Sequence, residues 1–82
     1  MKRKKILIVD DEPDINLALK MALEGNSFEV DAFNDALSAL ENFRKGLYDL
    51  LILDIKMPKM NGFQLYREIK KIDDKDMLSN SW

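Results

Sequence analysis

The sequence has no cysteine and no histidine among its 82 residues. The lack of cysteine excludes disulfides, a thiolate nucleophile and cysteine-bound zinc; it fits a reducing compartment, so we expect a cytoplasmic protein. The lack of histidine excludes a Ser-His-Asp triad, a histidine metal site and a phosphohistidine on this chain. Long apolar runs are missing too: no stretch approaches the roughly 18 residues of a membrane-spanning helix, so we expect no membrane partner.

Charge of one sign is not in large excess either. The net charge is -2, so no broad positive field favours nucleic acid as a partner. We interpret the basic residues 1–4 as a solvated tail, with a nucleic-acid or membrane patch as the alternative. The apolar run after them ends at Asp10, too early for the core of a signal peptide. A length of 82 residues and a hydrophobic fraction of 46% predict one small globular domain.

Three aspartates stand out because each follows an apolar run. Asp10 and Asp11 follow residues 6–9, and Asp54 follows residues 50–53. Such runs of Ile, Leu and Val are typical of strands buried on both faces. Neighbouring parallel strands lie about 4.8 Å apart, so all three carboxylates would share one sheet edge. Their repulsion favours a bound cation, and a hard ion such as Mg2+ fits. The alternative is that they are helix caps and an ordinary turn residue.

Strands and helices are predicted to alternate along the chain. Strands are expected over residues 5–9, around 28–32 and over 49–54, from their apolar runs or alternation. Helices are expected from 13 to 24, from 35 towards 46 and over 63–72, from apolar residues at helical spacing. This order predicts an α/β fold, a flavodoxin-like doubly wound parallel sheet with strand order 2-1-3.

Particular residues are predicted to begin and end the helices. The pair Gly25-Asn26 predicts a left-handed cap after the first helix. Asn34 predicts the N-cap of the second helix, whose apolar side would be formed by Leu37, Leu40 and Phe43. Asn61 and Gln64, three residues apart, predict a capping box before the third helix.

Two segments carry a further meaning: ILIVDDEP at residues 6–13 and LDIKMPKMNG at residues 53–62. With their spacing they resemble the receiver domain of two-component response regulators, and the resemblance covers residues 5–75. It implies a phosphoprotein module, rather than an enzyme, that takes a phosphoryl group from a sensor histidine kinase or a phosphotransfer protein. By position, Asp54 would be the nucleophile and become an aspartyl phosphate. Mg2+ would be bound directly by Asp11, mainly through water by Asp10, and by the backbone carbonyl of Lys56.

Physical reasoning supports the same site independently of the family. In a parallel sheet ordered 2-1-3, the order in which successive strands are added reverses between strands one and three. Ligands bind at such a switch point. Asp10, Asp11 and Asp54 are all expected there. A bare carboxylate repels a phosphoryl group, and Mg2+ between them would offset that repulsion.

The sequence departs from the family pattern near Asp76, so residues 76–82 form a divergent end. A complete receiver has a fourth and a fifth strand, whose ends supply a hydroxyl residue and a lysine that convert phosphorylation into a shape change. We expect both strands to be missing, because Met77-Leu78 is a short apolar run; Ser81 lies near the place of the hydroxyl residue. We therefore expect impaired switching, a partly bare sheet face beside the first helix, and self-association through the open edge of strand three.

Two other functions remain open from the sequence. The first is a non-signalling fragment that binds Mg2+ weakly or associates with itself. The second is a phosphohydrolase of the haloacid dehalogenase type, which also uses an aspartate at the end of a parallel strand. That family needs a second aspartate two residues after the nucleophile, where this chain has Lys56, so we disfavour it.

Overall fold

The computed structural model describes residues 3–74 and 78–79. Its elements, in chain order, are β1 (Lys5–Val9), α1 (Pro13–Glu24), β2 (Glu29–Phe33), α2 (Ala36–Asn42), β3 (Leu50–Leu53), α3 (Gly62–Ile72) and β4 (Leu78–Ser79). The alternation of strands and helices predicted from the apolar spacing is confirmed. Among the residues described, no helix has the length and apolar character to cross a membrane.

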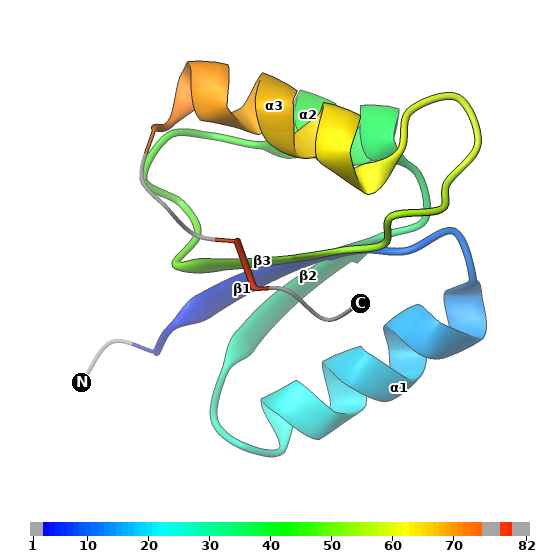
Figure 1. Cartoon of the computed structure of the whole chain (residues 1–82). Coiled ribbons are helices and arrows are strands. Elements are labelled where there is room, and N and C mark those ends of the chain that lie inside the picture. The colour runs from blue at the N-terminus through cyan, green and yellow to red at the C-terminus, as the bar shows by residue number, and fades with distance from the viewer. Residues whose placement is uncertain (1–2, 75–77, 80–82) are drawn as a thin grey trace.

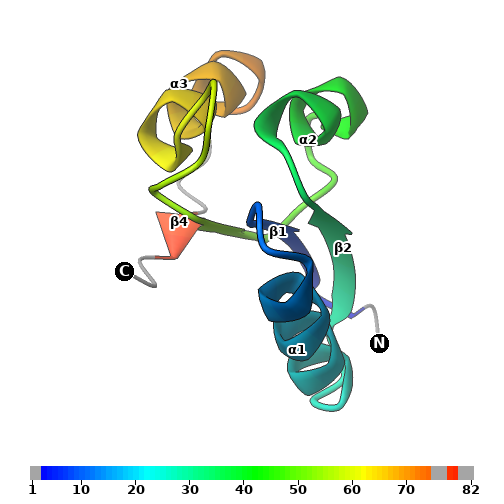
Figure 2. The same cartoon turned by 90° about the vertical axis from the view of Figure 1, so that its right-hand side faces the viewer.

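The strands form one parallel sheet in the order β2-β1-β3-β4. Helix α1 covers one face, and α2 and α3 lie together on the other, as Figures 1 and 2 show from two directions. This division follows from right-handed crossovers, since the connection from β1 to β2 runs one way across the sheet and those from β2 to β3 and from β3 to β4 run the other way. The doubly wound α/β fold and the order 2-1-3 of its first three strands are confirmed.

A short fourth strand is present where we expected none. β4 pairs in parallel with β3, with Leu51 opposite Leu78 and Ile52 opposite Ser79. The expectation that strand four is missing and that β3 is an open edge is therefore wrong. Ladder hydrogen bonds come from the backbone, so two residues can pair without a long apolar run. Ser81 lies outside the described residues, and within the described ranges there is no fifth strand.

Each face of the sheet has its own apolar core. The core beneath α2 and α3 takes alternate strand residues, namely Leu7, Val9, Leu51 and Leu53. The core beneath α1 takes the intervening positions and contains three buried residues, Ile6, Ile8 and Val30. Ile15 of α1 is 41% exposed, and Leu50 and Ile52 are only partly buried. The α1 face is thus the less covered of the two, as expected.

The N-cap of α3 agrees with its prediction, and that of α2 does not. Asn61 and Gln64 exchange two side-chain-to-backbone hydrogen bonds of 2.9 Å, which form the capping box. The N-cap of α2 is Asp35 rather than Asn34, because the Asp35 carboxylate accepts from both the N–H and the hydroxyl of Ser38, at 2.8 and 2.9 Å. A carboxylate also interacts favourably with the helix dipole at this end.

The end of α1 and the buried side of α2 also differ from their predictions. Gly25 is right-handed, with a φ of -64°, and the left-handed residue is Ser27, with a φ of 70°. Of the three residues predicted to form the apolar side of α2, Phe43 is buried and Leu40 is partly buried against the same core, whereas Leu37 is 51% exposed. The buried positions of α2 are Ala36 and Ala39. Helical spacing alone could not identify these buried positions of α2. Its small alanines let the helix approach the sheet closely.

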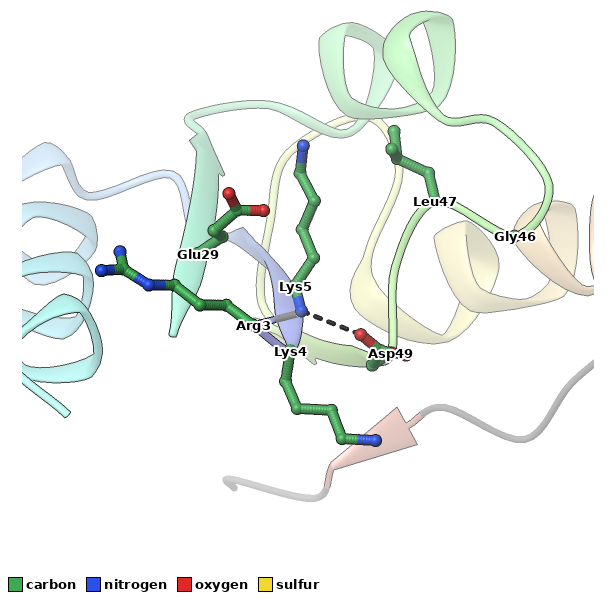
Figure 3. Close-up of a pocket in the computed structure, with 7 residues that line it drawn as sticks. All are labelled: Arg3, Lys4, Lys5, Glu29, Gly46, Leu47 and Asp49. Carbon is green, nitrogen blue, oxygen red and sulfur yellow. Dashed lines mark hydrogen bonds between the residues drawn. The ribbon is translucent and has the colours of Figure 1, made fainter. Parts of the chain in front are cut away.

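A hollow of about 400 Å³ lies at the amino-terminal edge of the sheet, opposite the edge predicted to hold the aspartates (Figure 3). In it, the backbone N–H of Lys5 donates to Asp49 Oδ2 at 2.9 Å. The side chains of Arg3 and Lys4 extend in different directions, and Glu29 adds an opposite charge (Figure 3). Because these groups do not converge on one point, the hollow does not indicate an anion site.

Gly62, the first residue of α3, lies against the backbone that follows β3. A Cβ here would collide with the carbonyl oxygen of Asp54 and approach its carbonyl carbon to 3.0 Å. We predict that Gly62→Ala lowers the free energy of unfolding by about 1–3 kcal/mol in urea titrations. Gly25→Ala is the matched control: the nearest atom to its Cβ would be the Met21 carbonyl oxygen at 3.4 Å, and its backbone is helical. It should be neutral or stabilise by up to about 1 kcal/mol; equal stabilities would contradict the close approach at Gly62.

Candidate functional site

Three carboxylates meet at the carboxyl-terminal edge of β1 and β3. The register places Val9 opposite Leu53, so the next residues, Asp10 and Asp54, are neighbours. Asp11 follows in the loop that leads to α1. One oxygen of each carboxylate lies within 4.8 Å of the other two. The structure thus brings together all three aspartates that the sequence singled out.

Backbone hydrogen bonds fix the orientation of two of these carboxylates. The Asp54 N–H donates to the Val9 carbonyl at 2.9 Å, which continues the ladder between the strands. Asp10 Oδ1 accepts from the Glu12 N–H at 2.9 Å, and Asp54 Oδ1 accepts from the Lys56 N–H at 3.2 Å. Within the described part of the chain, Oδ2 of each carboxylate is therefore the oxygen left for a ligand.

The electrostatics of the cluster disfavour its full negative charge. Burial raises the pKa of the Asp10 carboxyl above its ordinary 3.8, the hydrogen bond from Glu12 lowers it, and the charges of Asp54 and Asp11 raise it again. The net direction is upward. Like charges this close disfavour one another's ionisation, and a cation among them would reverse that effect.

The donor set fits a hard divalent cation. All three side chains offer oxygen, Asp11 is exposed, and Asp10 and Asp54 are half-buried. Mg2+ prefers oxygen ligands and keeps several waters, so it is commonly bound by one or two carboxylates on an open edge. These residues are thus suited to Mg2+ in number, chemistry and exposure.

Lys56, the fourth predicted ligand, lies beside the aspartates because its N–H donates a hydrogen bond to Asp54 Oδ1. Coordination by its backbone carbonyl stays a prediction. A hollow of about 240 Å³ adjoins the aspartates; it is lined by Ile8, Val9, Asp10, Ile15, Leu19, Ile52, Leu53 and Asp54. A ligand at this edge would therefore meet carboxylates on one side and apolar side chains on the other.

One residue near the site was missed by the sequence analysis. Asn16 is only 4% exposed and is the buried residue of α1. Its Nδ2 donates to the backbone carbonyl of Asp10 at 2.8 Å. A single asparagine between apolar helix positions is usually solvated, so the helical pattern gave no sign of it. The available indication was its place in the first turns after Asp10 and Asp11.

The chain is similar in sequence to proteins of a known family. A family model described as the response regulator receiver domain matches residues 6–78. The CpxR homolog of Haemophilus influenzae, a transcriptional regulatory protein, is 37% identical over 70 residues, which cover 85% of this chain and 30% of that protein.

Two solved structures are similar in both sequence and fold. One is the complex of the histidine kinase ThkA with the response regulator protein TrrA: 41% identity, a TM-score of 0.82, and 92% of this chain against 65% of that one. The other is TrrA from Thermotoga maritima in complex with Mg(2+)-BeF: 44% identity, a TM-score of 0.75, and 83% against 59%. The chain therefore spans less than two thirds of each similar protein.

We predict that Asp10→Asn stabilises the metal-free protein at pH 7 by up to about 1 kcal/mol, the scale of exposed charge interactions. A folded-state pKa raised above 3.8 means that the folded state holds the Asp10 proton more tightly than the unfolded state does. Ionisation of Asp10 therefore lowers the free energy of unfolding as the pH rises through that range. Asparagine removes the charge and can still accept from the Glu12 N–H. Urea unfolding at pH 7 and pH 3 measures the effect, which should shrink at pH 3.

The exposed Asp74→Asn, which lies away from every helix N-terminus among the residues described, is the control for this substitution and should change stability little at either pH. Millimolar Mg2+ should stabilise the unmodified protein more than Asp10→Asn. A metal-free Asp10→Asn that is less stable than the unmodified protein at pH 7 would contradict repulsion within the cluster.

Proposed function

The chain belongs to the response regulator receiver domain family, and on that premise we propose that Asp54 accepts a phosphoryl group. The observation that carries the proposal is the meeting of Asp54 with Asp10 and Asp11, whose carboxylate oxygens lie within 4.8 Å of one another. They lie where parallel α/β sheets bind ligands, outside the carboxyl ends of strands at a topological switch point.

The chemistry asked of Asp54 is nucleophilic attack on phosphorus. A carboxylate oxygen forms the new P–O bond while the bond from phosphorus to the leaving nitrogen of phosphohistidine breaks, and its electron pair stays on that nitrogen. The product is an acyl phosphate. Asp54 Oδ1 accepts from the Lys56 N–H, which orients the carboxylate. Carboxylates are established covalent nucleophiles for phosphoryl groups.

We propose that Asp11 and Asp54 would bind Mg2+ directly, Asp10 mainly through water, and the Lys56 carbonyl as a further ligand. Bound there, Mg2+ supplies positive charge that offsets the repulsion between carboxylate and phosphoryl oxygens. The solved structure of TrrA in complex with Mg(2+)-BeF supports this assignment by similarity. The half-burial of Asp10 and Asp54 limits how many waters compete for the same oxygens.

The phosphoryl donor is proposed to be a sensor histidine kinase or a phosphotransfer protein in the cytoplasm. The 82 residues contain no histidine, so the phosphohistidine donor must lie outside them. The complex of ThkA with TrrA supports a kinase as partner by similarity. The segment that matches the family contains the proposed acceptor. The hydroxyl residue and the lysine of a complete receiver have no counterpart in residues 5–75. We therefore propose that this segment, taken by itself, is impaired in switching.

Self-association is a second candidate function, and the thin cover of the α1 face favours it. Ile15 is 41% exposed, and the neighbouring Leu50 and Ile52 of β3 are only partly buried. Pairing through the edge of β3 is disfavoured because β4 already occupies it. Sedimentation over a wide concentration range would detect association, and Ile15→Lys should then abolish it.

We predict that acetyl phosphate or phosphoramidate phosphorylates Asp54 alone, and only with Mg2+. Intact-mass and fragment mass spectrometry at low temperature measure the site and extent. Asp54→Asn should lose the modification completely, because an amide is not a nucleophile for phosphorus. It should also lose any change induced by beryllofluoride, which needs the carboxylate.

Asp74→Asn, a change at an exposed aspartate after α3, is the matched control and should be modified normally. Modification that persists in Asp54→Asn, or that maps to Ser79 or Ser81, would show that Asp54 is not the acceptor. Modification at the same rate without Mg2+ would contradict the metal requirement.

A further inference from the structure

Asn16 ties together the two loops that meet at the site. Its Nδ2 lies 2.8 Å from the Asp10 carbonyl oxygen, 2.9 Å from the Phe33 carbonyl oxygen and 2.6 Å from Asn34 Oδ1. Asp10 directly follows β1, Phe33 is the last residue of β2, and Asn34 directly follows β2. One buried side chain of α1 therefore holds the carboxyl ends of both strands.

The bond to Asp10 acts on the peptide that joins the two aspartates. The Asp10 carbonyl belongs to the peptide unit between Asp10 and Asp11, and that unit is planar. Fixing its oxygen therefore fixes the direction in which Asp11 leaves the strand. The Asp10 N–H is held from the other side by the Phe33 carbonyl, at 3.1 Å. Asn16 and Phe33 together thus set both ends of the Asp10 backbone.

The surroundings of Asn16 argue against a role in stability alone. Its Nδ2 has two hydrogens for three oxygen neighbours. Its Oδ1 is buried and has no hydrogen-bond partner among the residues described. A buried amide oxygen without a partner costs stability, and this cost offsets part of what the donor contacts of Nδ2 contribute. The structure thus has the Nδ2 donor of Asn16 in place although its Oδ1 is unsatisfied.

We propose that Asn16 is a positioning residue for the acidic cluster: its amide holds the Asp10–Asp11 peptide so that both carboxylates converge with Asp54 on a divalent cation. The inference rests on the proposed metal site, since it assigns the group that orients two of its ligands. Groups that orient metal ligands through a hydrogen bond commonly change metal affinity by about 10–100-fold when they are removed.

The test is the affinity for Mg2+ of the full chain, measured from the amide NMR shifts of Asp11 and Asp54 at a temperature where every variant is folded. Asn16→Ala should weaken Mg2+ binding by about tenfold or more. It should also speed hydrogen exchange at the Asp10 amide in the metal-free protein, relative to the amide of Leu51 in the core. Asn16→Ser, whose shorter side chain cannot span the same distances, is the second variant and should behave likewise if Asn16→Ala does not fold.

Two controls separate positioning from packing. Val30→Ala removes buried volume from the same α1-side core without contacting Asp10, so it should lower stability and leave Mg2+ affinity within about twofold. Asn34→Ala removes one neighbour of Nδ2 but leaves the Asp10 bond, and it should also leave the affinity unchanged.

Each outcome decides one of the two claims. Unchanged Mg2+ affinity in Asn16→Ala and Asn16→Ser, with normal binding by the unmodified protein, would overturn the role of Asn16 alone. An equal loss of affinity in Val30→Ala would also overturn it, since packing would then explain the effect. No Mg2+ binding by the unmodified protein would overturn the proposed metal site itself.

Discussion

Repulsion among three carboxylates at one sheet edge is the constraint on which the site depends. The parallel pairing of β1 with β3 forces it, because Val9 opposite Leu53 makes Asp10 and Asp54 neighbours. The raised pKa of Asp10 is the local consequence of burial and of its two acidic neighbours. A fold that brings these charges together gains from a cation and loses when the cation leaves, so metal binding and stability are linked.

The rest of the fold holds this edge in place. The sheet is fixed by two cores of alternate strand residues, Leu7 and Val9 facing α2 and α3, and Ile6 and Ile8 facing α1. Close contact between Gly62 and the Asp54 backbone brings the start of α3 next to the proposed acceptor. On the other side of the site, α1 reaches the same edge through the amide of Asn16. The hollow beside the site lies on the less covered face of the sheet, where Ile15 and Leu19 of α1 line it together with Ile52 of β3.

Much of this could be predicted from the sequence, because the relevant patterns are local or are imposed by topology. The buried runs before Asp10 and Asp54 predicted parallel strands, and parallel strands require their carboxyl ends to meet. The capping box of Asn61 and Gln64 depends on two residues three apart and was predicted for the same reason.

What could not be predicted depends on contacts between distant segments. Asp35 rather than Asn34 caps α2, and Asn34 instead lies against Asn16, a contact across 18 positions. β4 forms by backbone pairing that leaves little trace in side-chain pattern. The importance of Asn16 arises only when α1 is packed on the sheet. Helical spacing placed Leu40 and Phe43 correctly against the core but missed the two buried alanines of α2, whose small side chains add little to an apolar pattern.

The central claim is that the three carboxylates converge on one cation, and Mn2+ used as a paramagnetic probe tests it most directly. At substoichiometric Mn2+, the account predicts that amide NMR signals of residues next to Asp10, Asp11 and Asp54 broaden first. The signal of Leu47, in the hollow at the opposite edge of the sheet, should stay sharp at the same concentration. Broadening that spreads evenly over exposed acidic residues such as Glu41 and Asp74, with no preference for the three aspartates, would contradict the account.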